Sequence, residues 1–238
     1  MTNRRPNPNV LLERVNAEEA KRGRLKIYIG MAAGSGKTYT MISDALVEKN
    51  RGIDVVAGYI EPHGRKETEN LANQLEAIPP HMIDHNGVMV PEFNLDAALA
   101  RHPEILLIDE LAHTNARGAR HLKRWQDVEE CLKAGISVYT TLNVQHIESL
   151  VDVVRQITGA PVKETVPDTI IRSADEVELI DITPNELIQR LKDGKIYEAD
   201  KVKTALTHFF KRGNLLALRE LVLRVASERV GEQLITHR

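Results

Sequence analysis

The sequence predicts an α/β protein in which a mainly parallel central sheet is flanked by helices. The first observation is a β-forming segment, residues 25–29, that runs into a glycine-rich turn and then into an apolar-periodic helix beginning near Lys37. The second is another buried-type strand, 54–60, which closes a strand–helix–strand unit within about forty residues and so favours parallel strands. The third is the apolar run 105–108, which is typical of a strand buried on both faces.

The turn after the first strand has the features of a phosphate-binding P-loop. Residues 30–38 read Gly-Met-Ala-Ala-Gly-Ser-Gly-Lys-Thr, which gives the required order of strand, glycine-rich loop, Gly-Lys-Thr and helix. Backbone N–H groups of such a loop converge on phosphate oxygens, Lys37 reaches the β- and γ-phosphates, and Thr38 ligates magnesium. Met31 stands where the usual pattern has glycine, which occurs one residue earlier at Gly30. The residues expected to bind ATP here are Gly30, Ala33, Gly34, Ser35, Gly36, Lys37, Thr38 and Tyr39.

The apolar strand 105–108 ends in Asp109 and Glu110, which is the arrangement of a Walker B strand. It is expected to deliver Asp109 beside Thr38, so that these two residues hold a magnesium ion, partly through water. Glu110 is then placed to orient a water molecule or to position the γ-phosphate, which makes it the candidate catalytic residue. Together the two motifs predict a RecA-like P-loop NTPase fold, here with a helical C-terminal extension.

Polar segments follow the carboxyl ends of three predicted strands, where ligands bind in open α/β sheets. The cations that are either phosphate contacts or solvated side chains are Arg65 and Lys66 in the loop 61–68, and Arg117 and Arg120 in the loop 111–121. After the strand 136–142, Thr141 and Asn143 are placed to sense a γ-phosphate, as polar residues there commonly do in RecA-like NTPases. Asn143 is equally suited to cap the helix that follows, and both interpretations stay open.

The remaining pattern predicts further elements and three parts of the chain. Further helices are expected at 11–22, from Leu71 to Ile78, at 94–100, from Leu122 to Leu132, and at 184–192, about 198–211 and 215–235. Further strands are expected at 162–166 and 177–181, and a turn between Pro79 and Gly87. The parts are an N-terminal tail with a short helix, 1–23, the ATP-binding core, 24–160, and C-terminal strands and helices, 161–238, which pack on the core and lead to an absent next domain.

The amino-acid composition of the chain disfavours several classes of function. The 238 residues have a formal net charge of −2 and a pI of about 6.5, which disfavours direct nucleic-acid binding. No apolar run approaches the roughly 20 residues that cross a bilayer, and no apolar core of a signal peptide follows the N-terminus. Cys131 is the only cysteine, which excludes an intrachain disulfide and a cysteine-based zinc site. A soluble, cytoplasmic protein is expected.

Six stretches between residues 24 and 235 are more specific than a P-loop alone. They are residues 25–38, 61–68, 107–115, 120–130, 140–150 and 181–184. The strings Asp-Glu-Leu-Ala-His-Thr-Asn and Thr-Leu-Asn-Val-Gln-His are the most distinctive of them. In these stretches the chain closely resembles the N-terminal cytoplasmic domain of the Kdp potassium-sensing histidine kinases, whose loop also has its glycine one place early.

The resemblance implies a regulatory ATP-binding domain of a membrane-anchored sensor kinase that controls a potassium-uptake operon through a response regulator. In this family the domain is thought to bias the kinase against the phosphatase output of a distant catalytic module. The implied partners are ATP–Mg and the remaining domains of the sensor kinase, namely a universal-stress-protein-like domain, transmembrane helices and the kinase core. Contact with a membrane is expected only through the full-length protein.

The sequence shows no phosphoacceptor helix and no kinase ATP site, so the chain is not expected to autophosphorylate and at most hydrolyses ATP slowly. It is expected to be either a part of a longer protein or a short natural form. A regulatory ATP–Mg module is the preferred interpretation, and a stand-alone slow ATPase or small-molecule kinase is the alternative, because Glu110 is available although no acceptor site can be assigned. A nucleic-acid motor is disfavoured by the net charge and by the single RecA-like core.

Overall fold

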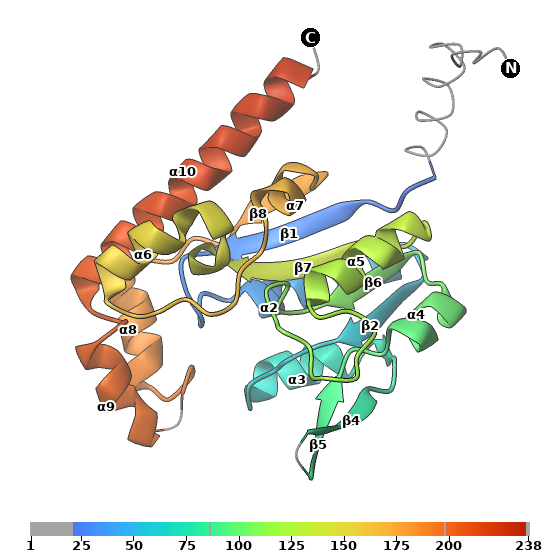
Figure 1. Cartoon of the computed structure of the whole chain (residues 1–238), viewed down its shortest axis with the longest axis horizontal. Coiled ribbons are helices and arrows are strands. Elements are labelled where there is room, and N and C mark those ends of the chain that lie inside the picture. The colour runs from blue at the N-terminus through green and yellow to red at the C-terminus, as the bar shows by residue number, and fades with distance from the viewer. Residues whose placement is uncertain (1–20, 86, 198, 237–238) are drawn as a thin grey trace, which may run out of the picture.

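The computed structural model describes residues 21–85, 87–197 and 199–236, and a six-stranded sheet forms its centre (Figure 1). Neighbouring strands are parallel throughout, in the order β3-β2-β6-β7-β1-β8. The strands are β1 (Leu25–Gly30), β2 (Val55–Tyr59), β3 (Glu76–Ala77), β6 (Ile105–Ile108), β7 (Ser137–Asn143) and β8 (Glu176–Leu179). The predicted α/β class with a parallel central sheet flanked by helices is therefore confirmed. The tail and helix expected within residues 1–20 lie outside the described residues.

Helices cover both faces of the sheet, and the strand sequences explain why. Side chains alternate across a strand, so Leu106 and Ile108 of β6 join one hydrophobic core while Ile105 and Leu107 join the other. The first core includes residues of α4, α5, α6, α8 and α10, and the second includes residues of α2. The helices are α2 (Lys37–Asn50), α3 (Lys66–Ala72), α4 (Leu95–Arg101), α5 (Arg124–Lys133), α6 (Val151–Thr158), α7 (Asp168–Arg172), α8 (Pro184–Lys192), α9 (Ala199–Thr207) and α10 (Arg212–Thr236), with 3-10 turns η1 (Val144–His146) and η2 (Glu148–Leu150).

The start of α8 shows how local sequence sets a helix boundary. The Thr183 hydroxyl accepts a hydrogen bond from the Glu186 N–H at 3.2 Å, and the Glu186 carboxylate accepts one from the Thr183 N–H at 3.0 Å. Pro184 occupies the first turn, where its missing N–H has no cost. The predicted helix at 184–192 is confirmed. None of the helices in the part of the chain that the structure describes combines the length and apolar character needed to cross a bilayer.

Several predictions about single elements are wrong, because tertiary pairing outweighs the local pattern. The helix expected to reach Ile78 ends at Ala72, and the chain then pairs with β2 through the short strand β3. The expected turn at 79–87 is an antiparallel hairpin of β4 (His81–His85) and β5 (Val88–Glu92). Leu122 precedes α5 and is exposed. The segment 162–166 is not a strand, and the short helix α7 follows it.

Arg124, at the start of α5, connects three elements beneath the carboxyl ends of the strands. Its side chain is 0% exposed, and Nη1 donates to the Asp109 carbonyl oxygen at 3.0 Å. Nη2 lies 3.3 Å from Glu92 Oε2 at the end of β5, and the guanidinium carbon lies 4.1 Å from the centroid of the Tyr59 ring at the end of β2. This one side chain therefore ties β2, β5 and β6 to α5.

We predict that Arg124→Met lowers the free energy of unfolding by about 3–5 kcal/mol, because it leaves the buried Glu92 carboxylate without its arginine. Urea denaturation measures the change. The matched control is Arg120→Met, since Arg120 also pairs with two carboxylates, Asp96 and Glu130, but on the surface. Its loss should cost less than about 1 kcal/mol. Equal effects of the two substitutions would contradict the assigned role of Arg124.

Candidate functional site

The loops that follow β1, β2, β6 and β7 meet at the carboxyl edge of the sheet and enclose a cleft of about 110 Å³. In parallel sheets this edge is where ligands bind. The predicted site residues that line the cleft are Ala33, Gly34, Gly36, Lys37, Thr38, Arg65, Asp109, Glu110, Thr141 and Asn143. The fold thus brings into one place residues that four separate loops contribute.

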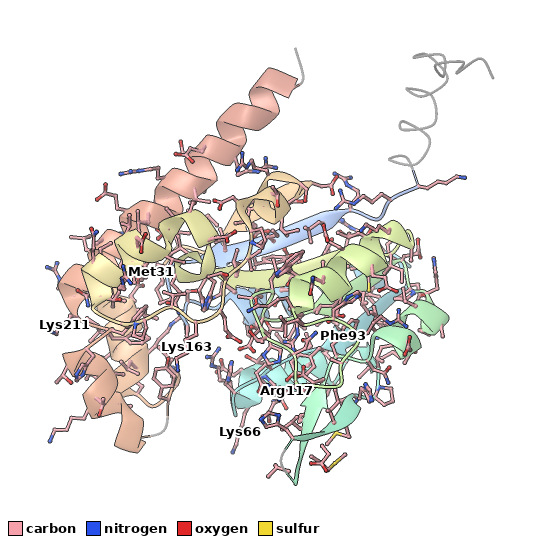
Figure 2. All side chains as sticks on the ribbon, in the orientation of Figure 1. Met31, Lys66, Phe93, Arg117, Lys163 and Lys211 are labelled. Atoms are coloured by element: carbon pink, nitrogen blue, oxygen red, sulfur yellow. The ribbon has the colours of Figure 1, made fainter. Side chains whose placement is uncertain are left out.

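Glycines shape the loop between β1 and α2, which we call the glycine-rich loop (residues 31–36). Gly34 and Gly36 have φ angles of 87° and 103°, in the left-handed region that favours glycine. A β-carbon on Gly30 would lie 2.5 Å from Ser35 Oγ, so the loop closes tightly over the end of β1. Met31, at the place where the usual pattern has glycine, is buried in the hydrophobic core and anchors the start of the loop (Figure 2).

Lys37 points its ammonium group back into this loop. Nζ donates to the Ala32 carbonyl oxygen at 3.0 Å and to Ser35 Oγ at 3.2 Å, and the residue is 8% exposed. Burial lowers the pKa of Lys37 to about 8, although the charge of Asp109 works in the opposite direction. Within the described residues no carboxylate forms an ion pair with Lys37. A cation held by neutral oxygens alone fits an anionic ligand.

Asp109 lies next to Thr38 at the bottom of the cleft. Thr38 Oγ1 donates to Asp109 Oδ2 at 3.0 Å, and the Thr141 hydroxyl on β7 donates to Oδ1. The N–H of Glu61 donates to Oδ2 at 3.2 Å. Burial raises the pKa of the Asp109 carboxyl, while the bond from Thr141 acts to lower it. These clustered oxygens are the ligand type that Mg²⁺ prefers, so Thr38 and Asp109 fit the predicted metal.

Glu110 is restrained by His63, a residue that the sequence analysis did not select. His63 Nε2 lies 3.1 Å from Glu110 Oε1. The φ angles of Glu110 and His63 are 57° and 51°, a conformation that non-glycine residues rarely adopt and that is common at functional sites. Burial is the largest influence on Glu110 and would raise its pKa, but the bond from His63 together with the charges of His63, Arg124 and His113 leaves this pKa below its ordinary value. The same bond raises the pKa of His63.

Asn143 does not cap the turn that follows it, because its side chain makes no hydrogen bond to η1. Among the described residues Asn143 Oδ1 is buried without a partner, and so is Gln145 Oε1. A buried acceptor without a donor costs free energy, so such an atom marks a place where a bound water or ligand fits. The cap interpretation is therefore wrong, and the sensing interpretation stays a prediction for a residue that lines the cleft.

Two predicted arginines are not in the cleft. Arg120 pairs on the surface with the carboxylates of Glu130 and Asp96 and does not line the cleft. Arg117 lies in the polar loop beside the β4–β5 hairpin (Figure 2), where its neighbour Gly118 faces Ile83. The structure therefore does not bring either arginine to the expected phosphate contact. Tyr39 and Lys66 line an adjoining groove instead of the cleft.

Further polar side chains in the cleft are not among the predicted site residues, although the first three of them lie in stretches that are typical of the resembled family. These are His63, His113, His146 and Glu164. His146 lies in a stretch that is typical of the resembled family, and its Nδ1 lies 2.9 Å from the Glu164 carbonyl oxygen. Burial lowers the pKa of His146, which favours the neutral ring. Only the tertiary structure places Glu164 here, because the strand predicted at 162–166 does not form and no sequence pattern assigns this residue to the cleft.

Comparison with known proteins identifies the family. A family model described as "Osmosensitive K+ channel His kinase sensor domain" (KdpD) matches residues 21–230. The sensor protein KdpD of Clostridium acetobutylicum is 55% identical over 229 residues, which cover 95% of this chain and 25% of the relative. That of Escherichia coli K12 is 51% identical over 230 residues, covering 97% and 26%. That of Mycobacterium tuberculosis H37Rv is 52% identical over 203 residues, covering 85% and 24%.

These relatives are sensor proteins, and the matched region is a sensor domain of the histidine-kinase class. The chain belongs to the KdpD sensor-domain family. It spans about a quarter of the length of the curated relatives named above. The resemblance to the Kdp potassium-sensing kinases, predicted from the sequence, is confirmed.

We predict that Lys37→Met stabilises the ligand-free protein by about 1–2 kcal/mol at pH 7, because the variant removes a buried ammonium group. The two lost hydrogen bonds offset part of the gain. The cost of the buried charge is complete below the folded-state pKa of about 8 and disappears above the ordinary pKa of 10.5, so the gain should shrink as pH rises between these values.

Urea denaturation at pH 7 and pH 10 tests this expectation. The control is Lys211→Met, an exposed lysine at the left of the view in Figure 2, which should change stability by less than about 0.5 kcal/mol. A Lys37→Met variant that is less stable than wild type at pH 7 would show that Lys37 supports the fold instead of a ligand.

Proposed function

We propose that this domain binds ATP–Mg and thereby regulates the output of a potassium-regulating sensor kinase of which it forms a part. The observation that carries the proposal is the 3.0 Å hydrogen bond from Thr38 Oγ1 to Asp109 Oδ2. It joins the residue that ends the Gly-Lys-Thr motif to the carboxylate that ends β6, and both are oxygen donors suited to Mg²⁺. A glycine-rich turn that occurred by chance would have no reason to lie beside a buried carboxylate such as that of Asp109.

The strand order supports a RecA-like P-loop fold. Strand β7 lies between β1, which leads into the glycine-rich loop, and β6, which ends in Asp109. Because β7 carries Thr141 to the same edge, a third polar group faces the two motifs. The Thr141 and Asn143 side chains are therefore positioned to respond to a terminal phosphate.

Different residues of the chain bind different parts of the nucleotide. Backbone N–H groups of the glycine-rich loop and of the α2 N-terminus bind phosphate oxygens, aided by the helix dipole. Lys37 supplies the positive charge, for which the described residues provide no ion-pair partner. Thr38 and Asp109 would hold the magnesium ion, which neutralises phosphate charge when bound. Arg65, at the entrance of α3, is a further cation in the lining of the cleft.

The regulatory part of the proposal follows from the family and the size of the chain. The relatives are named sensor proteins, and this chain corresponds to about a quarter of each. We infer that the remaining parts of such a sensor receive the signal of nucleotide occupancy and that the kinase core carries out phosphoryl transfer. ATP–Mg then acts on this domain as a regulatory ligand.

The test is calorimetric titration of ATP–Mg into wild type, Lys37→Ala and the exposed control Lys211→Ala, with phosphate release followed in the same samples. Wild type and Lys211→Ala should bind, Lys37→Ala should lose at least about tenfold in affinity, and turnover should stay well below about 10 s⁻¹. Equal affinity of wild type and Lys37→Ala, or no binding by wild type, would overturn the proposal.

A slow ATPase activity is the second candidate, and the position of Glu110 favours it. Glu110 lines the cleft beside Asp109, so it is available to orient a water molecule. Its carboxylate is bonded to His63, which keeps it from that role. A restrained carboxylate of this kind suits a domain that binds ATP and hydrolyses it slowly.

We predict that His63→Asn raises the rate of ATP hydrolysis several-fold, because it releases Glu110. Asparagine tolerates the positive φ of this position and is too short to replace the imidazole. Glu110→Gln should abolish hydrolysis while leaving ATP affinity within about threefold. Phosphate release under saturating ATP–Mg measures both rates. If His63→Asn slows hydrolysis as Glu110→Gln does, His63 assists Glu110 and does not restrain it.

A further inference from the structure

A second cavity adjoins the cleft on the side of the C-terminal helices. This groove has a volume of about 560 Å³, whereas the cleft at the metal position has only about 110 Å³. Pockets that enclose a whole small ligand usually measure roughly 300–1,000 Å³. The cleft is therefore large enough for a terminal phosphate and its metal, but not for a nucleotide. The two spaces share Gly34, Gly36, His63 and Arg65 in their linings, so one ligand can extend through both.

The far wall of the groove belongs to the C-terminal part of the chain. Arg190, near the end of α8, donates from Nη1 to the Gly34 carbonyl oxygen at 3.1 Å. Arg65 donates from Nε to the Lys195 carbonyl oxygen at 3.0 Å, in the turn after α8. Gly34 itself touches this segment, since a β-carbon there would lie 2.3 Å from Ile196 Cδ1. Helix α8 and its following turn thus close the groove over the glycine-rich loop.

The side chains that line the groove are mostly positively charged and favour the binding of an anion. Its lining includes the cations Arg65, Lys66, Arg190 and Lys195, and Glu67 is the single carboxylate among the lining residues. In the described part of the chain, neither Arg65 nor Arg190 forms an ion pair with a carboxylate. Positively charged side chains that lie close together repel one another, and a bound anion would remove this repulsion.

Tyr39 offers the groove an aromatic surface. It follows Thr38 on the first turn of α2, is 46% exposed and lines the groove. An aromatic ring at such a position stacks on a nucleobase, whatever the base, because every base has a flat π face. Arg190 reaches from the far wall of the same groove toward the loop, and its Nη1 atom would be 3.6 Å from a β-carbon on Gly36. A charged group and a stacking surface therefore border one space.

We propose that this groove holds the nucleoside end of the bound nucleotide, with Tyr39 stacking on the base and Arg190 contacting the phosphate next to the ribose. The inference rests on the proposed ATP–Mg binding and adds a binding residue from the C-terminal segment. Occupancy then fastens α8 and the turn after it to the glycine-rich loop. The C-terminal helices, and not only the loop, sense whether a nucleotide is present.

The test compares ATP–Mg with magnesium tripolyphosphate, which has the phosphates but no nucleoside, by calorimetric titration of the whole chain. Wild type should bind ATP at least about fivefold more tightly than tripolyphosphate. Tyr39→Ala should remove this difference by weakening ATP alone. Arg190→Gln should weaken ATP by about tenfold, Arg190→Lys should retain most of the affinity, and the control Arg224→Gln, an exposed arginine on α10, should bind like wild type.

The outcomes separate this inference from the function on which it rests. If wild type binds neither ligand, the proposed function and the groove assignment fall together. If wild type binds both ligands with equal affinity, or if Arg190→Gln and Arg224→Gln bind ATP equally well, only the groove assignment is overturned. Thermal unfolding of each variant without ligand confirms that a lost affinity does not come from a lost fold.

Discussion

A carboxylate shielded from water has to be surrounded by hydrogen-bond donors, and Asp109 meets this requirement at the edge of the sheet. It is 1% exposed, and its donors come from α2, from the loop after β2, from the next residue along the chain and from β7. A shift of any of these segments relative to β6 would remove a donor from a buried charge. One side chain therefore ties α2, the loop after β2 and strand β7 to the end of β6, in the arrangement that forms the cleft.

The site accepts unfavourable features that a core built only for stability would avoid. Lys37 is buried among neutral oxygens, Glu110 and His63 have left-handed backbone conformations, and Asn143 Oδ1 has no donor among the described residues. Each of these features costs free energy in the ligand-free protein. The surrounding structure can support the cost, because Arg124 holds the backbone of Asp109 from the opposite side. Strain concentrated in one place of an otherwise regular fold is a sign of function.

The parts predicted from sequence are those whose chemistry depends on short spacings. A glycine-rich turn between a strand and a helix, and a carboxylate at the end of an apolar strand, can be recognised from neighbouring residues, and the parallel sheet then brings Lys37, Thr38 and Asp109 to one edge. Arg190 was missed, since it reaches Gly34 from 156 positions away and carries no motif of its own. The β4–β5 hairpin was missed for a related reason, because Pro79-Pro80 before it and Asn86-Gly87 within it suggest a turn, whereas cross-strand pairing decides the conformation.

Helix α10 contains 25 residues, which makes it about 37 Å long, and it extends past the body of the sheet (Figure 1). Its first turns are joined to α8 by a 3.2 Å bond from Arg212 Nε to Asn185 Oδ1, and to the segment after β8 by the ion pair of Arg219 and Asp181. Further along, Arg229 Nη2 donates to the Ala174 carbonyl oxygen at 2.6 Å. The helix is therefore fixed at three places, and the seven residues after Arg229 extend it by about 10 Å. A rod bound along most of its length moves with the domain as one piece, so a shift of α8 would reach the end of α10 without being absorbed in a flexible joint.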